Sequence, residues 1–237
     1  MFAIYKREMR YFFTGPVGYV FVAIFFAVSA GIFMSLTVQL GENASYISYF
    51  VYMIMLCLVE IPLLTMKLLS EERKMKTDQL ILTAPVSIFG IVMAKFLAAY
   101  TLFGGSFIIS SIIYYIPLAK YGTPQPALYI GSVAVVLLIG AAFVAAGEFI
   151  SSLTENQFLA AFGTIAVLAL LIFAHNINNA ISSEFLRRIF SAISVSARYS
   201  DFFMYGRFDW ASIVYFISLA AAFLFLTVRV FERRRWA

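Results

Sequence analysis

Charged residues are scarce in this chain. Only 12% of its 237 residues are Asp, Glu, Lys or Arg, whereas 63% are hydrophobic. A water-soluble domain of this size carries about 25% charged residues. So few charges could not cover its surface in water, which excludes a soluble globular protein. We therefore expect an integral membrane protein with a single membrane domain over residues 1–237, whose core is completed by lipid and neighbouring helices.

Cysteine and histidine are nearly absent as well. The single Cys57 excludes an internal disulfide, and its apolar surroundings in the sequence predict a small buried side chain. The only histidine, His175, precedes several asparagines. One imidazole with amides makes neither a metal site nor a nucleophile–base pair, so we expect a polar cap at a membrane interface. No bound metal or cofactor is expected in this chain.

The chain also lacks the Gly-x-x-x-x-Gly-Lys-Ser/Thr loop that holds nucleotide phosphates. We therefore expect that it is not an enzyme and does not hydrolyse ATP by the usual route. An energised mechanism would need a separate subunit. Nothing in the sequence indicates a nucleic-acid partner.

Long apolar runs are abundant, and six of them reach the length of about 20 residues that a membrane helix needs. They are continuous rather than alternating, which favours helices over the strands of a membrane barrel. The sequence thus predicts an all-α membrane protein, with spans at 17–38, 47–68, 89–116, 127–150, 158–175 and 210–231.

Positive charges near the span ends predict the orientation. One side would hold Lys6, Arg7, Arg10, Arg73, Lys74, Lys76, Arg229, Arg233, Arg234 and Arg235. The other holds Lys120 and a longer loop in which acidic residues accompany four arginines. We therefore expect a multi-pass protein of the cell inner (plasma) membrane with both termini in the cytoplasm.

Two amphipathic segments flank the spans. In residues 1–16, Tyr5, Met9 and Phe12 share one helical face and the basic residues share the other, which is typical of a helix lying in the membrane interface. A plain positively charged flank is the alternative. In residues 176–209, apolar residues recur every four positions from Ile181 to Ile193, which predicts a short helix on the outer surface.

The charged break at residues 69–88 is the first candidate site, since we expect it to be a short helix that docks on a soluble partner. Pairing at i,i+3 and i,i+4 would support the helix, an apolar patch would enter a groove, and charges would fix the register. The alternative is a solvated loop that only sets topology. The candidate contacts are Glu71, Glu72, Arg73, Lys74, Asp78, Leu80, Ile81 and Leu82.

The turn between the fourth and fifth spans is a second candidate contact. Its residues are Ser151, Ser152, Thr154, Glu155 and Asn156. Ser, Thr and Asn side chains accept hydrogen bonds from free amides at the start of a helix, so capping of the fifth span is also expected.

Ionisable residues within the spans are costly and suggest function. Glu60 lies deepest, before Pro62, and we expect it to face the interior of the bundle or of a dimer, as a possible intramembrane polar site. Lys67, Lys95 and Glu148 lie near span ends, and we expect their side chains to reach the interface.

Several motifs resemble the transmembrane subunits of type-2 ABC exporters, in particular permeases of the gliding-motility and copper-processing systems. They are Tyr5-Lys-Arg-Glu, Gly15-Pro-Val-Gly, Pro62-Leu-Leu-Thr-Met-Lys-Leu-Leu-Ser-Glu-Glu-Arg-Lys74, Leu82-Thr-Ala-Pro-Val-Ser87 and Ser151-Ser-Leu-Thr-Glu-Asn-Gln157. One departure is Lys76-Thr-Asp-Gln-Leu-Ile81, where the family usually reads Gly-Thr-Leu-Glu-Leu-Leu.

The resemblance implies a six-span permease with an N-terminal interfacial helix, which pairs with a second copy or a related permease in the lipid bilayer. It implies that the loop after the second span is a coupling helix docked on a cytosolic ABC ATPase, and that this partner binds ATP and Mg. A self-powered secondary transporter or channel is the alternative, and an intramembrane enzyme is a third. The transported substrate is not readable from the sequence.

Overall fold

The computed structural model describes residues 1–38, 46–76, 86–121, 124–177, 184–196, 198–199 and 209–235. These ranges are helical and contain no strand. Six helical stretches are long and apolar enough to cross a membrane: Pro16–Thr37, Tyr46–Lys74, Ile88–Lys120, Pro126–Leu153, Gln157–His175 and Trp210–Arg234. The predicted all-α class and the six predicted spans are therefore confirmed.

The helices follow one another along the chain with short connections. They are α1 (Phe2–Thr14), α2 (Pro16–Phe33), the π-helical turn η1 (Met34–Val38), α3 (Tyr46–Thr65), α4 (Ser70–Lys74), α6 (Ile88–Tyr121), α7 (Pro126–Leu153), α8 (Gln157–Ile177), α9 (Glu184–Ile193) and α11 (Trp210–Arg235). Pro16 suits the first turn of α2, because the missing amide hydrogen is not needed there.

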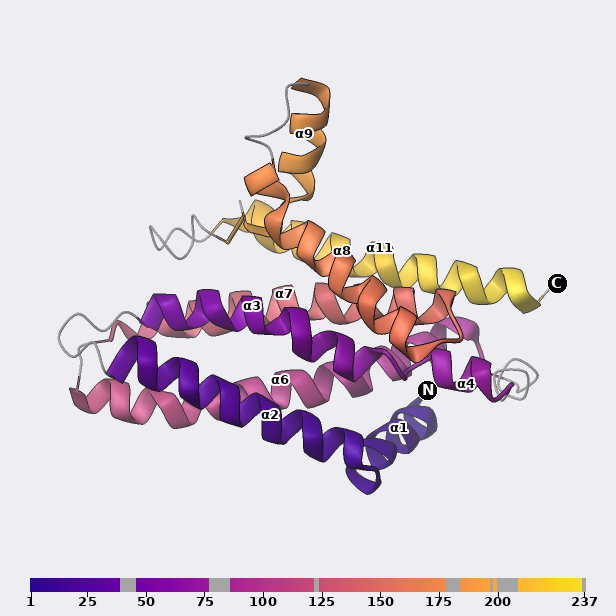
Figure 1. Cartoon of the computed structure of the whole chain (residues 1–237), viewed down its shortest axis with the longest axis horizontal. Coiled ribbons are helices and arrows are strands. Elements are labelled where there is room, and N and C mark those ends of the chain that lie inside the picture. Colours follow the sequence, from indigo (N-terminus) through magenta and orange to yellow (C-terminus); the bar gives the residue numbers. More distant parts are fainter. Residues whose placement is uncertain are drawn as a thin grey trace.

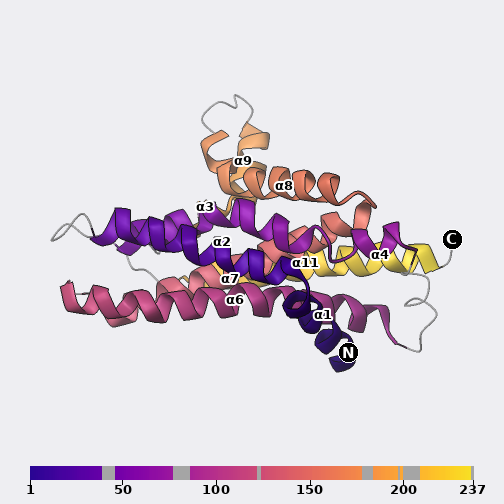
Figure 2. The ribbon, with the colours of Figure 1, turned by 60° about the horizontal axis from the view of Figure 1, so that its bottom comes forward.

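The spans run along a common long axis, and α7 packs against α3, α6, α8 and α11 (Figure 1). Both views place α1, α4 and the end of α11 at the same end of the bundle (Figures 1 and 2). Beyond α8, the short helix α9 projects away from the other helices. Of the predicted amphipathic segment 176–209, residues 184–193 are helical, whereas Ile181 lies outside the described residues.

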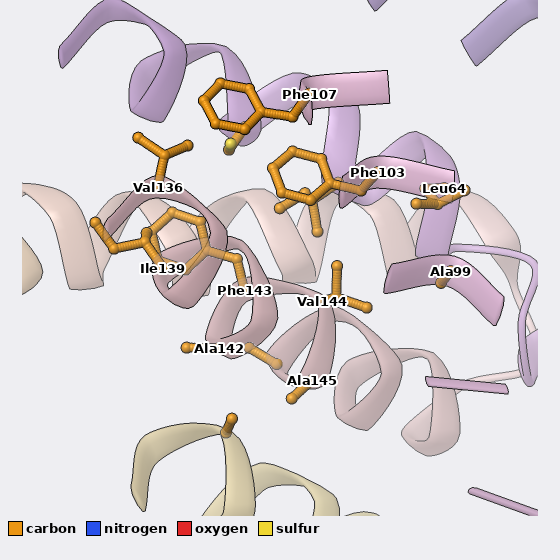
Figure 3. Close-up of a cluster of buried hydrophobic side chains, with 14 of the residues drawn as sticks. Leu64, Ala99, Phe103, Phe107, Val136, Ile139, Ala142, Phe143, Val144 and Ala145 are labelled. Carbon is orange, nitrogen blue, oxygen red and sulfur yellow. The ribbon is translucent and has the colours of Figure 1, made fainter. Parts of the chain in front are cut away.

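The core lies where α3, α6 and α7 meet (Figure 3). Phe103 and Phe107 of α6 stack on each other, with ring centroids 6.3 Å apart, and face Ile139 and Phe143 of α7. Gly140 lets the two helices approach, since a Cβ atom there would lie 2.1 Å from the Phe103 ring. This contact fixes the register of α6 against α7.

The substitution Gly140→Ala is expected to destabilise the fold, because the added methyl group overlaps the Phe103 ring. Overpacking of this kind costs about 1–3 kcal/mol. Thermal unfolding of the purified protein in detergent measures the effect. Gly105→Ala is the matched control, because its Cβ would meet nothing within 4 Å. Equal melting temperatures for the two variants would contradict this account of the core.

Candidate functional site

A buried lysine lies where α1, α4 and α6 meet. The Lys95 side chain is 1% exposed, and its Nζ lies 3.1 Å from Glu8 Oε1 and 3.0 Å from Glu72 Oε1. It also donates a hydrogen bond of 2.8 Å to the carbonyl oxygen of Leu68. The expectation that Lys95 reaches the membrane interface is therefore wrong, since three acceptors inside the protein match its three donors.

Arg7 completes a cluster of four charges. Its Nη2 lies 2.5 Å from Glu8 Oε1 and 2.8 Å from Glu72 Oε1, so each of these two carboxylates lies between Arg7 and Lys95. We call Arg7, Glu8, Glu72 and Lys95 the four-charge cluster. It joins the N-terminal helix to α4 and to α6. A buried charge is stable only when it is paired and hydrogen-bonded, and here the pairing comes from distant parts of the chain.

The neighbouring Glu71 also faces α1. Its Oε2 accepts a hydrogen bond of 3.0 Å from the Tyr11 hydroxyl. Burial, assisted by this bond, raises the pKa of Tyr11 to about 12. The pairing expected for Glu71 and Glu72 within their own short helix is thus replaced by bonds to α1 and α6. The physical reason is that α4 spans only Ser70–Lys74, so packing against other helices decides where its side chains point.

The two candidate contacts predicted from the sequence lie against each other. Arg73 Nη1 donates to the carbonyl oxygen of Ser152 at 3.1 Å, and its Nη2 lies 3.4 Å from Glu155 Oε1. The Ser151 hydroxyl accepts hydrogen bonds of 3.2 Å from the amides of Leu69 and Ser70. The segment after α3 and the α7–α8 turn therefore form one surface, which we call the joined surface.

The α7–α8 turn also caps α8, as expected. Asn156 Oδ1 accepts a hydrogen bond of 2.9 Å from the amide of Phe158, and Thr154 Oγ1 accepts one of 3.1 Å from the amide of Asn156. Arg234 of α11 adds a contact that the sequence did not indicate, because its Nη2 donates to the Ser152 carbonyl at 2.6 Å. The end of the last span is thereby tied to the joined surface.

Exposure separates the outward-facing residues from the internal ones. Lys74, Glu155 and Asn156 are exposed, whereas Glu71, Glu72 and Arg73 are partly covered by their neighbours. Met75 is 60% exposed and was missed, although it follows directly after the charged residues of α4. The predicted contacts Asp78, Leu80, Ile81 and Leu82 lie outside the described residues.

A cavity of about 290 Å³ lies between α1 and α4. It is lined by Arg7, Glu8, Tyr11, Lys67, Leu68, Glu71, Glu72, Met75 and Lys95. Within the part of the chain that the structure describes, no group of three His, Cys, Asp or Glu side chains could hold a metal ion.

Two further carboxylates are buried inside the spans. Glu60 on α3 is 1% exposed and faces the interior of the bundle, as expected, and Glu148 on α7 is fully buried. The prediction that Glu148 reaches the interface is therefore wrong, because the close packing of α7 against α3 and α6 covers it. Among the described residues, no group hydrogen-bonds to the carboxylate oxygens of either residue.

Replacing Lys95 by Met is expected to destabilise the protein by about 3–5 kcal/mol, because Glu8 and Glu72 would stay largely buried with one partner fewer. Chemical or thermal unfolding in detergent measures the loss. Lys74→Met serves as the control, since an exposed substitution changes stability by only about 0.5 kcal/mol. If both variants unfold at the same point, the four-charge cluster is not what holds α1 in place.

No protein-family model matches the chain, and none of the curated proteins compared with it matches either. The function must therefore be argued from the motifs of the sequence and from the contacts at this end of the bundle.

Proposed function

We propose that this chain is the membrane-spanning permease subunit of an ABC transporter that works as an exporter, energised by a separate cytosolic ATPase. One observation carries the proposal. The two segments that the family resemblance identifies as cytosolic contacts lie against each other, through Arg73 with Glu155 and through Ser151 with the amides of Leu69 and Ser70. A single partner could therefore contact both segments at once.

In this proposal, the end of the bundle that holds both termini lies in the cytoplasm. The exposed Lys6 and Arg10 of α1 then face the lipid headgroups, where basic residues are attracted to anionic lipids. The joined surface faces the partner. Lys74, Met75, Glu155 and Asn156 are the described residues best exposed to touch it.

Force applied to α4 would reach the spans through short polar contacts. Glu72 leads to Lys95 on α6 and to Arg7 on α1, while the amide of Ser70 leads to Ser151 on α7. Arg73 and Arg234 both donate to the carbonyl of Ser152, which adds α11. ATP and Mg would be bound by the partner, and differential affinity of ATP for its closed state would drive the movement.

A complete transporter would need two such six-span domains. The second would be a copy of this chain or a related permease, with the substrate passing between them. The present residues do not identify that substrate.

The proposal is tested by purifying the tagged chain from its native membrane and measuring ATP hydrolysis in the eluate. The double variant Lys74→Glu with Met75→Glu is expected to lose most of this activity, because both side chains are exposed on the joined surface. Glu71 and Glu72 are poorer test positions, since their carboxylates bond within the chain.

Lys120→Glu at the opposite end of the bundle is the control for a change of charge alone, and it should retain the activity. ATP hydrolysis that is absent from the wild-type eluate, or unchanged in the double variant, would refute docking of an ATPase at this surface.

A self-powered transporter is the second candidate, and Glu60 is the observation that favours it. A carboxylate without a hydrogen-bond partner inside a span is costly and suggests a transport role. Burying a charged group without a partner also destabilises a protein.

The substitution Glu60→Leu separates the two candidates. For an ABC permease, the variant should keep the co-purified ATPase activity and unfold at a higher temperature, because an unsatisfied polar group is removed. Glu60→Gln is its isosteric control. Loss of function in both variants, with folding intact, would favour transport through Glu60.

A further inference from the structure

Glu148 lies at the level of Lys95 across the contact between α6 and α7. These two helices run in opposite directions, and their register is fixed where Phe103 meets Gly140. Lys95 lies eight residues before Phe103, and Glu148 lies eight residues after Gly140. Equal spacing along antiparallel helices, at about 1.5 Å per residue, brings the two side chains to the same depth.

The carboxylate of Glu148 has no hydrogen-bond partner there. The side chain is fully buried, and neither oxygen contacts a donor among the described residues. The charged groups near enough to act on it are the ammonium of Lys95 and the carboxylate of Glu8. A buried acceptor of this kind costs free energy for as long as it stays unsatisfied, so its persistence calls for a role.

We propose that Glu148 is the second acceptor of Lys95, and that Lys95 exchanges the carboxylates of α1 and α4 for that of α7 when α4 moves. The exchange rests on the proposed function for the source of that movement. In the described arrangement, Lys95 holds Glu8 and Glu72. In the other arrangement, it pairs with Glu148 and releases α1 together with α4. Lys95 is thus a positioning residue with two partners.

The two arrangements differ little in the number of unsatisfied charges. Glu8 and Glu72 are 9% and 16% exposed at their side chains, so water reaches them once they leave Lys95. Glu148 has no such access and depends on Lys95 for a donor. The ammonium of lysine sits on a flexible four-carbon stem, which allows it to turn from one acceptor to another without a shift of its helix.

The acceptor on α7 stays in place during the exchange. Gly147 brings α7 against α3, since a Cβ atom there would lie 2.3 Å from Thr65 Oγ1. The contacts of α7 with α11 hold the other side. Movement is therefore expected in α1 and α4, with α7 and α11 as the fixed reference.

Spin labels at Arg10 on α1 and Arg233 on α11 test the exchange, because both side chains are exposed and lie on the parts that should separate. The labelled full chain carries Cys57→Ala and is placed in lipid nanodiscs without an ATPase. Pulsed electron paramagnetic resonance then gives the distance distribution. Wild type should show one main distance. Glu72→Gln should add a second, because Lys95 loses one charged acceptor.

Adding Glu148→Gln to Glu72→Gln should lower the second population by about tenfold, since a charge-assisted hydrogen bond that favours it is lost. Glu60→Gln is the matched control, because Glu60 is also buried without a hydrogen-bond partner but burial is the only influence found on it. That control should leave the second population unchanged. Glu8→Gln replaces Glu72→Gln if the latter does not fold.

A distribution that is unaltered by both Glu72→Gln and Glu8→Gln would overturn the exchange, as would equal effects of Glu148→Gln and Glu60→Gln. The experiment contains no ATPase, so its result is independent of docking. Absence of a co-purified ATPase would refute the proposed function and leave the exchange standing, whereas docking without a Glu148-dependent population would do the reverse.

Discussion

An ammonium group inside a membrane protein must be neutralised at close range, and Lys95 meets this constraint with groups from three parts of the chain. Glu8 comes from the N-terminal helix, Leu68 from the end of the second span and Glu72 from α4. Because each contact is needed to satisfy the same ammonium, these segments cannot be placed independently. The position of α1 and of α4 against the bundle follows from this one buried charge.

The polar contacts at this end of the bundle extend the same logic to the remaining spans. The carbonyl of Ser152, at the end of α7, accepts hydrogen bonds from Arg73 and from Arg234. The hydroxyl of Ser151 satisfies two amides at the start of α4. Unsatisfied backbone groups are expensive near lipid, so these bonds stabilise the packing while they connect the helices. The proposed coupling of a soluble ATPase to the spans would use this connection.

The core of the bundle is made differently from its charged end. Phenylalanine rings of α6 fill the space against α7, and Gly140 removes the side chain that would block them (Figure 3). Tight apolar packing of this kind transmits displacement and resists change. A rigid core beside an end with two available acceptors for one lysine is an arrangement that could move in discrete steps.

The hydrophobic runs by themselves determined the helical class, the six spans and the short turns between them, because the length and apolarity of a membrane helix are local properties of the chain. Capping by Asn156 was likewise readable, since the cap and the amides lie within three residues. The motifs also indicated which polar segments belong together.

Only the tertiary structure decided where the charges near the span ends point. Lys95 and Glu148 read as residues able to reach the interface, yet both are buried. Glu72 read as an exposed docking residue, yet its carboxylate pairs with Arg7 and Lys95. The partners that settle these directions lie more than 20 residues away in the chain, and no local pattern encodes a pairing that depends on the register between helices.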